Sequence, residues 1–207
     1  MARRAWRVAL AGDLDRAERL IEDARTFGDK CAIVGSKETS FIQRGELRWQ
    51  QGRLAEMLNL SRAVFEASAG VVPGIALVLV RVLCERADLH DEARALVSEL
   101  GTDRFEALQL GPFWSSALVI TAESALILDV PAVSRTIRDL LAPFADQVAF
   151  TGTWVTAPIA YGLGVAMIGC DDPEAPAMLD RAAEIAGRLG APVLARMARE
   201  APGALRV

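Results

Sequence analysis

The sequence predicts an all-α protein in which about five antiparallel helix pairs stack into a right-handed superhelix. One observation is a turn motif that starts at Gly12 and returns, altered, near residues 52, 87, 128 and 169. The resulting spacings of 40, 35, 41 and 41 residues are typical of helix-pair repeats. Between the turns, apolar residues recur at three- and four-residue intervals, the period of a half-buried helix. No strand pattern competes, because the nearest candidate, 148–151, is too short.

The composition favours one globular domain over residues 1–207. Hydrophobic residues make up 52% of the chain and charged residues 24%, and the mean hydropathy of +0.26 is high for a free soluble domain. The net charge is −4 with no basic stripe, which argues against nucleic acid as a partner. The most apolar run, 71–80, is too short to span a bilayer, so we expect no membrane partner. Three scattered cysteines favour a reducing compartment, and we expect a cytoplasmic protein.

In each pair, helix A precedes the turn and helix B follows it. The first pair is 2–11 and a helix that Asp13 caps and Gly28 stops. The second pair is 30–50 and 54–68. The third helix A starts at Pro73 and is apolar nearly all round, which predicts an enclosed position; its helix B covers 90–100 and ends at a break over 101–103.

The fourth helix A covers 113–128 after an opening at Gly111-Pro112, and its helix B begins at Pro131. We expect a loop over 146–153. The fifth helix A, 154–168, contains Pro158, Gly162 and Gly164, which predict a kink. A helix B over 172–189 and a capping helix over about 192–200 complete the chain.

Five segments of the chain resemble the tetratricopeptide-like helical region of large actinobacterial regulators, which also carry a STAND ATPase and a nucleotide cyclase or LuxR-type output domain. The segments are 46–56, 91–96, 140–145, 161–164 and 189–196. The resemblance covers roughly residues 10–200 and implies a helical-repeat module that binds partners or ligands in bacterial regulation. This chain has no cyclase, no P-loop and no DNA-binding helix-turn-helix.

Aromatic residues gather on the predicted A helices, which line the concave face of such superhelices. They are Trp6, Phe41, Trp49, Phe113, Trp114, Trp154 and Tyr161. An aromatic groove suits a peptide or an apolar small molecule. The alternative is that these rings pack between the helices, as large residues at helical spacing usually do.

Three charged residues occupy similar positions in successive A helices. Glu46 and Arg81 lie six residues before their turns and Glu123 lies five before its own. Equal register in stacked repeats predicts a Glu46–Arg81–Glu123 ladder, because buried charges require partners. The ladder would orient a polar group of a ligand, or it would be a structural ion-pair network.

The residues for catalysis and metal binding are sparse. His90 is the only histidine, and its place in a turn predicts an exposed residue remote from any nucleophile. With three separated cysteines, no metal-ligand spacing exists, and Asp171-Asp172 fits a helix cap better than a cation site. We therefore expect no catalytic residues, no metal and no cofactor.

The leading hypothesis is a non-enzymatic module of bacterial regulation that binds a peptide, a protein or a small molecule in a concave groove. The predicted groove residues are Glu46, Trp49, Arg81, Trp114, Glu123, Trp154 and Tyr161. One alternative is an enzyme of a biosynthetic pathway with a closed apolar pocket between the A helices, in which Glu123, Arg81 or Tyr161 would act. Another is a structural homo-oligomer that associates through its apolar surface.

Overall fold

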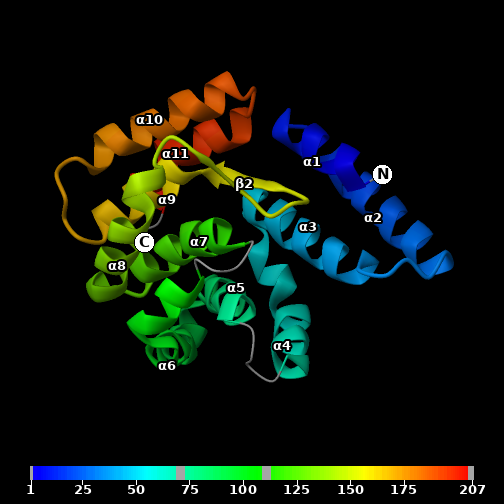
Figure 1. Ribbon diagram of the computed structural model, residues 1–207, viewed down its shortest axis with the longest axis horizontal. Helices are drawn as coiled ribbons and strands as arrows, with labels where there is room; N and C mark the ends of the chain where they lie inside the picture. The colour runs from blue at the N-terminus through cyan, green and yellow to red at the C-terminus, as the bar shows by residue number, and fades with distance from the viewer. Residues whose placement is uncertain (1, 69–72, 109–112, 205–207) are drawn as a thin grey trace.

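The computed structural model describes residues 2–68, 73–108 and 113–204, and this part of the chain is mostly helical, with one short two-stranded sheet (Figure 1). The α-helices are α1 (Ala2–Leu10), α2 (Leu14–Lys30), α3 (Ser36–Gln50), α4 (Leu58–Ala67), α5 (Pro73–Leu83), α6 (His90–Leu108), α7 (Trp114–Ile127), α8 (Pro131–Leu141), α9 (Ile159–Ile168), α10 (Ala175–Arg188) and α11 (Pro192–Ala204). Short 3-10 helices are η1 (Leu54–Met57), η2 (Ala87–Leu89) and η3 (Ala142–Phe144). The strands are β1 (Val148–Phe150) and β2 (Val155–Pro158).

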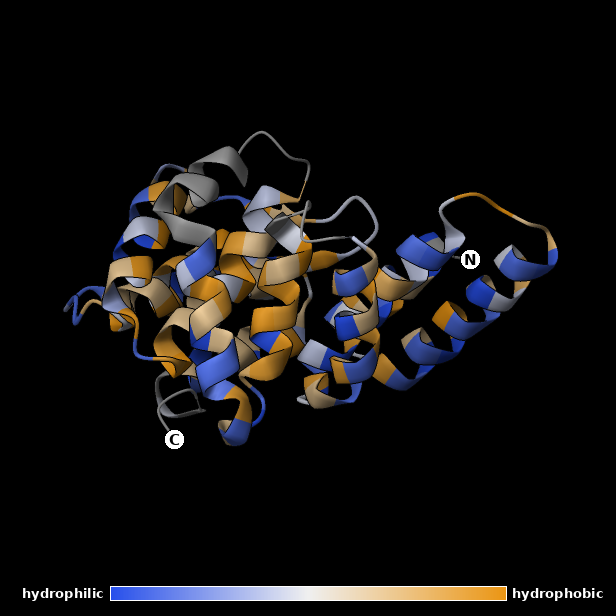
Figure 2. Cartoon of the chain, turned by 90° about the horizontal axis from the view of Figure 1, so that it is seen from below, coloured by the Kyte–Doolittle hydropathy of each residue, from blue (hydrophilic) through white to orange (hydrophobic). Residues whose placement is uncertain are grey.

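Helix α7 lies at the centre of the molecule. It packs against α5, α8 and α9, and most of its residues from Ser116 to Ala125 are buried. Helix α5 is enclosed as well, since Ala76 and the residues from Leu79 to Cys84 are buried. Hydrophobic residues concentrate in this half of the molecule, whereas the pair α2–α3 projects from it (Figure 2). The apolar character of the third and fourth A helices therefore reflects burial on several sides.

Four of the five recurring turns share one backbone conformation. Gly12, Gly52, Asp129 and Asp171 all have positive φ, between 53° and 93°. In each turn the next amide donates to the carbonyl five residues back, an arrangement known as the Schellman motif. These N–O distances are 3.2 Å for Asp13–Val8, 2.8 Å for Arg53–Arg48, 2.9 Å for Val130–Ala125 and 3.0 Å for Asp172–Met167. The turn at 87 differs, because an extended Arg86 leads into η2 there.

The predicted boundaries of α2, α3 and α6 were wrong. Gly28 does not stop α2, which continues to Lys30, and α3 begins only at Ser36. A Cβ at Gly28 would lie 2.5 Å from Ser36 Oγ, so this glycine allows the two helices to approach closely. The predicted break at 101–103 is also absent, since α6 continues to Leu108. The predicted opening at Gly111-Pro112 lies outside the described residues.

Between 146 and 168, where a loop and then a kinked helix from 154 were predicted, the chain forms a β-hairpin and only then α9, which begins at Ile159. Strands β1 and β2 pair antiparallel, with Gly152 at positive φ between them. Pro158 ends the hairpin and caps α9. Gly162 and Gly164 lie inside continuous α9, where an added Cβ would come within 2.8 Å of Val119 or Leu179. These glycines therefore allow α9 to approach α7 and α10 closely.

The hairpin reaches across to the projecting helices, where it contacts α3 (Figure 1). Gln43 Nε2 donates to the Thr153 carbonyl at 3.0 Å, and Gln50 Nε2 donates to the Val155 carbonyl at 3.4 Å. Trp154 is 1% exposed and belongs to a cluster formed by Ala5, Ala9, Ala17, Ile21 and Leu47. A segment of the predicted fifth pair therefore packs on the first two pairs, from which it is distant in the sequence.

Candidate functional site

Three of the predicted groove residues, Trp49, Arg81 and Tyr161, surround the carboxylate of Glu123 on α7, which is 2% exposed. Its Oε2 accepts hydrogen bonds from Trp49 Nε1 at 2.9 Å and from Arg81 Nε at 2.7 Å. Its Oε1 accepts a short hydrogen bond from the hydroxyl of Tyr161. Arg81 Nη1 also pairs with Glu85 at 2.5 Å. One carboxylate thus joins side chains from α3, α5 and α9 to α7.

The electrostatics of this cluster favour a fixed ion pair. Burial alone would lower the pKa of Arg81, but the negative charges of Glu123 and Glu85 outweigh it and raise the pKa above its ordinary value. Burial raises the pKa of Tyr161 well above its ordinary value, and the negative charge of Glu123 raises it further. Tyr161 therefore remains a neutral donor. The cluster is therefore a structural ion-pair network in which each charge has a partner.

Glu46 does not join this cluster, so the predicted ladder is correct only for Arg81 and Glu123. Glu46 Oε1 accepts a hydrogen bond from Thr156 Oγ1 at 2.6 Å, and Thr156 also bonds Ser116 Oγ at 2.9 Å. The other oxygen, Oε2, is buried and has no partner among the described residues. Burial raises the pKa of Glu46 to about 7, although the Thr156 hydrogen bond opposes this. Trp49, one turn further along α3, takes the place beside Glu123 that the ladder assigned to Glu46.

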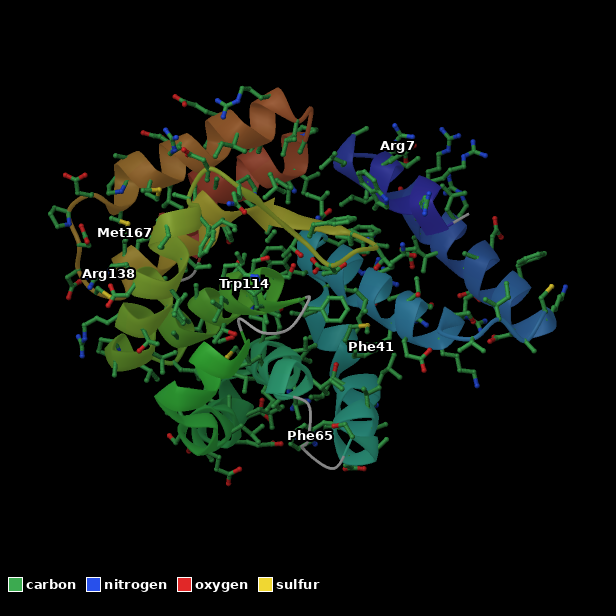
Figure 3. All side chains as sticks on the ribbon, viewed as in Figure 1. Arg7, Phe41, Phe65, Trp114, Arg138 and Met167 are labelled. Atoms are coloured by element: carbon green, nitrogen blue, oxygen red, sulfur yellow. The ribbon has the colours of Figure 1, made fainter. Side chains whose placement is uncertain are left out.

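Of the predicted groove aromatics, Trp49, Trp154 and Tyr161 are buried, whereas Phe113 is 45% exposed. The ring of Trp49 meets Tyr161 edge-on, with centroids 6.0 Å apart, and both residues are buried. Trp114 is half-buried and packs edge-on against Phe144, with centroids 5.0 Å apart (Figure 3). Trp154 precedes β2 and is buried near α1 and α2, and so it does not lie on a helix A. None of the seven predicted groove residues lines either pocket described next.

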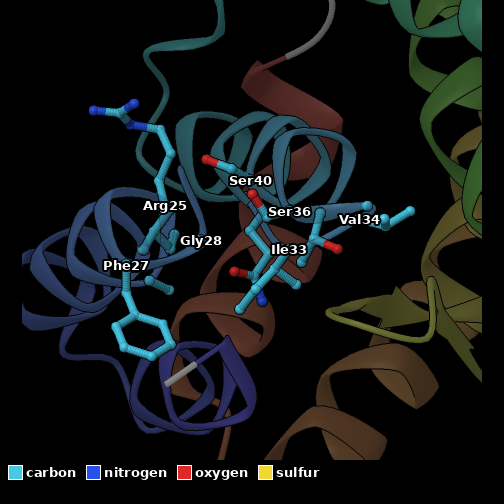
Figure 4. A pocket seen from close by; sticks show the side chains of 12 residues that line it. Arg25, Phe27, Gly28, Ile33, Val34, Ser36 and Ser40 are labelled. Atoms are coloured by element: carbon cyan, nitrogen blue, oxygen red, sulfur yellow. The ribbon is translucent and has the colours of Figure 1, made fainter. Parts of the chain in front are cut away.

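A pocket of about 330 Å³ opens between α2 and α3 near the turn that joins them (Figure 4). It is lined by Ile21, Ala24, Arg25, Phe27, Gly28, Ile33, Val34, Gly35, Ser36, Thr39, Ser40 and Gln43. Three of its apolar residues are well exposed: Phe27 at 51%, Ile33 at 49% and Val34 at 98%. Sequence reasoning missed this site because it placed the apolar segment 31–34 inside a helix. The signal available was an apolar run between Asp29-Lys30 and Gly35.

A second pocket of about 460 Å³ lies between α2 and α3 and has a mostly charged lining. Its lining includes Asp15, Glu18, Arg19, Glu22, Arg44 and Arg48. Arg48 pairs with Glu18 at 2.5 Å, and this hydrogen bond lowers the pKa of Glu18 to about 2. The charges of this pocket therefore partly neutralise one another, which makes it the weaker candidate for a binding site.

The described residues contain no group of His, Cys, Asp and Glu side chains that could hold a metal ion. His90 is half-buried rather than exposed, and its Nε2 lies 3.1 Å from the carbonyl of Cys84. Burial raises the pKa of the Cys84 thiol to about 11, which keeps it protonated and weakly nucleophilic. None of the helices in the described part of the chain is both long and apolar enough to cross a membrane.

Comparison with protein-family models, with curated proteins and with solved structures finds no match for this chain.

Proposed function

We propose that this protein is a non-enzymatic helical-repeat module of bacterial regulation, and that it binds another protein through the projecting pair α2–α3. We further propose that its helix pairs form a tetratricopeptide-like right-handed superhelix, which the hairpin 148–158 ties back to α3. The observation that carries the proposed function is the exposed apolar surface of Phe27, Ile33 and Val34 around an open pocket.

Exposed apolar residues are common when single, but a contiguous group beside a pocket is typical of an interaction site. The segment that holds Ile33 and Val34 forms an apolar turn at the end of the projecting pair (Figure 2). Val34 is almost fully exposed, so it contributes little to packing within this chain. Burying these side chains against a partner would be favourable, at about 25 cal/mol for each Å² of apolar surface removed from water.

The cluster around Glu123 supports a structural role better than a catalytic one. Its carboxylate already accepts three hydrogen bonds from Trp49, Arg81 and Tyr161. A substrate would have to displace at least one of these buried contacts, and each loss would leave a polar group without a partner. We therefore place the proposed binding surface on α2–α3 and not between the A helices.

Site-specific photo-crosslinking tests this function. A p-benzoylphenylalanine introduced at Val34 should give one adduct of defined mass in cells of the protein's own source. The matched control carries the same group at Leu189, which is 39% exposed at the end of α10. A Phe27→Asp substitution added to the Val34 reporter should abolish the adduct. Equal adduct patterns at positions 34 and 189, or an adduct that persists with Phe27→Asp, would contradict the proposal.

A further inference from the structure

The pocket between α2 and α3 contains a buried hydroxyl without a partner. Ser40 on α3 lines the pocket and is 6% exposed, and its Oγ has no hydrogen-bond partner among the described residues. Buried polar atoms in proteins are almost always paired, because an unpaired one is costly. The hydroxyls of Ser61 and Ser134 also lack a partner within the described part of the chain, but neither residue lines this pocket. The position of Ser40 therefore points to a partner atom that comes from outside the chain.

The charges at the pocket disfavour an acidic group. Among the described residues, Arg25 is the only charged one that lines the pocket. Its guanidinium is already bound by Glu22, at 2.6 and 3.1 Å, and by Asp29, at 2.7 Å. An acidic side chain would have to compete with two carboxylates for this arginine, and the three groups together carry a net negative charge. The inserted group should therefore not be acidic.

The walls of the pocket favour an aromatic ring with a polar tip. Ile21, Phe27 and Ile33 supply apolar surface, and the half-exposed ring of Phe27 can meet a second ring edge-on (Figure 4). The volume of about 330 Å³ lies at the lower end of the range of small-molecule sites, which suits a single large side chain.

We propose that the partner protein inserts a tyrosine side chain into this pocket. The ring packs against Phe27 and Ile33, and the phenolic hydroxyl hydrogen-bonds to Ser40 Oγ. Because both hydroxyls donate and accept, either direction of this bond satisfies Ser40. This inference rests on the proposed function, since it assumes that α2–α3 binds a protein.

The test compares two probes that differ by one hydroxyl. N-acetyl-tyrosinamide and N-acetyl-phenylalaninamide are titrated into the full chain, and binding is followed by chemical-shift changes of backbone amides. We expect the tyrosine probe to bind about three- to tenfold more tightly, the range that one net hydrogen bond supplies. Ser40→Ala should remove this preference while the phenylalanine probe binds as before. Ser134→Ala, which removes another buried unpaired hydroxyl, should leave the preference unchanged.

Equal affinities of the two probes for the unaltered protein would overturn the proposal, and so would a tyrosine preference that survives Ser40→Ala. Failure of both probes to bind would overturn it too. The proposed function is judged separately by the crosslink at Val34. A specific Val34 adduct without any tyrosine preference would therefore reject the tyrosine anchor and retain the binding surface.

Discussion

Replacing Glu46 by glutamine should remove a large part of the pH dependence of stability between pH 5 and pH 8. Burial raises the pKa of Glu46 in the folded protein from its ordinary value of 4.5 to about 7. The folded state therefore binds this proton more tightly than the unfolded state does. Its contribution to stability is fully present below pH 4.5, is lost as the pH rises toward 7, and stays lost at higher pH.

The size of the effect follows from the two pKa values. A difference of about 2.5 in pKa, at about 1.4 kcal/mol for each tenfold change in proton affinity, corresponds to about 3.5 kcal/mol. About 2.5 kcal/mol of this falls between pH 5 and pH 8, because the unfolded state has already begun to ionise at pH 5. The residue is half-buried as a whole, and its Oε2 is shielded from water and has no partner among the described residues.

Urea denaturation of the wild type and of Glu46→Gln at pH 5 and pH 8 measures the effect. On going from pH 5 to pH 8, the variant should gain about 2.5 kcal/mol in unfolding free energy relative to the wild type. Glu18→Gln is the matched control. The pKa of Glu18 is lowered to about 2, so this carboxyl is ionised in both states over most of that range. A wild-type-to-variant difference for Glu46→Gln that is the same at both pH values would refute the reasoning.

Three further predictions concern stability and are measured by urea or thermal unfolding. Gly52→Ala should destabilise the protein by about 1 kcal/mol because Gly52 has φ +66°, whereas Gly45→Ala inside α3 should stabilise it by up to about 1 kcal/mol. Neither added Cβ meets an atom within 4 Å, so the difference should come from the backbone alone. Changes in unfolding free energy of the same sign for the two variants would contradict this explanation. Glu123→Ala should lower the unfolding free energy by about 3–5 kcal/mol because it removes the buried partner of the Arg81 charge, and a loss below about 1 kcal/mol would argue against the structural ion-pair network. Trp154→Ala should cost about 3–5 kcal/mol through the cavity it creates, and a near-neutral effect would mean that the hairpin does not anchor the first helices.

The repeating turns could be predicted because their signal is local. A glycine or an aspartate at positive φ ends a helix, and Gly12, Gly52, Asp129 and Asp171 do so at nearly regular spacing. The contact between Arg81 and Glu123 could also be predicted, since it follows from similar register on neighbouring helices.

The hairpin and the pocket depend on contacts between distant residues, which the sequence pattern does not show. Thr156 is tied to Glu46, 110 positions earlier, and the short strand is held by that packing more than by its own propensity. The pocket was missed because Ile33 and Val34 look like part of an apolar helix until the closing turn is known. The sequence could not decide between an aromatic groove and packed rings for a related reason: the spacing that puts Trp49, which is buried, on a shared face is the same for a groove and for a core.

Hydrogen exchange of the full chain, with and without the partner isolated through the Val34 crosslink, tests the proposed binding surface most directly. We expect slowed exchange of backbone amides over 21–43, which includes the turn between α2 and α3 and the residues that line the pocket. Amides of α7, already enclosed in the free protein, should change little. Protection confined to other helices, with 21–43 exchanging as in the free protein, would contradict the placement of the binding site.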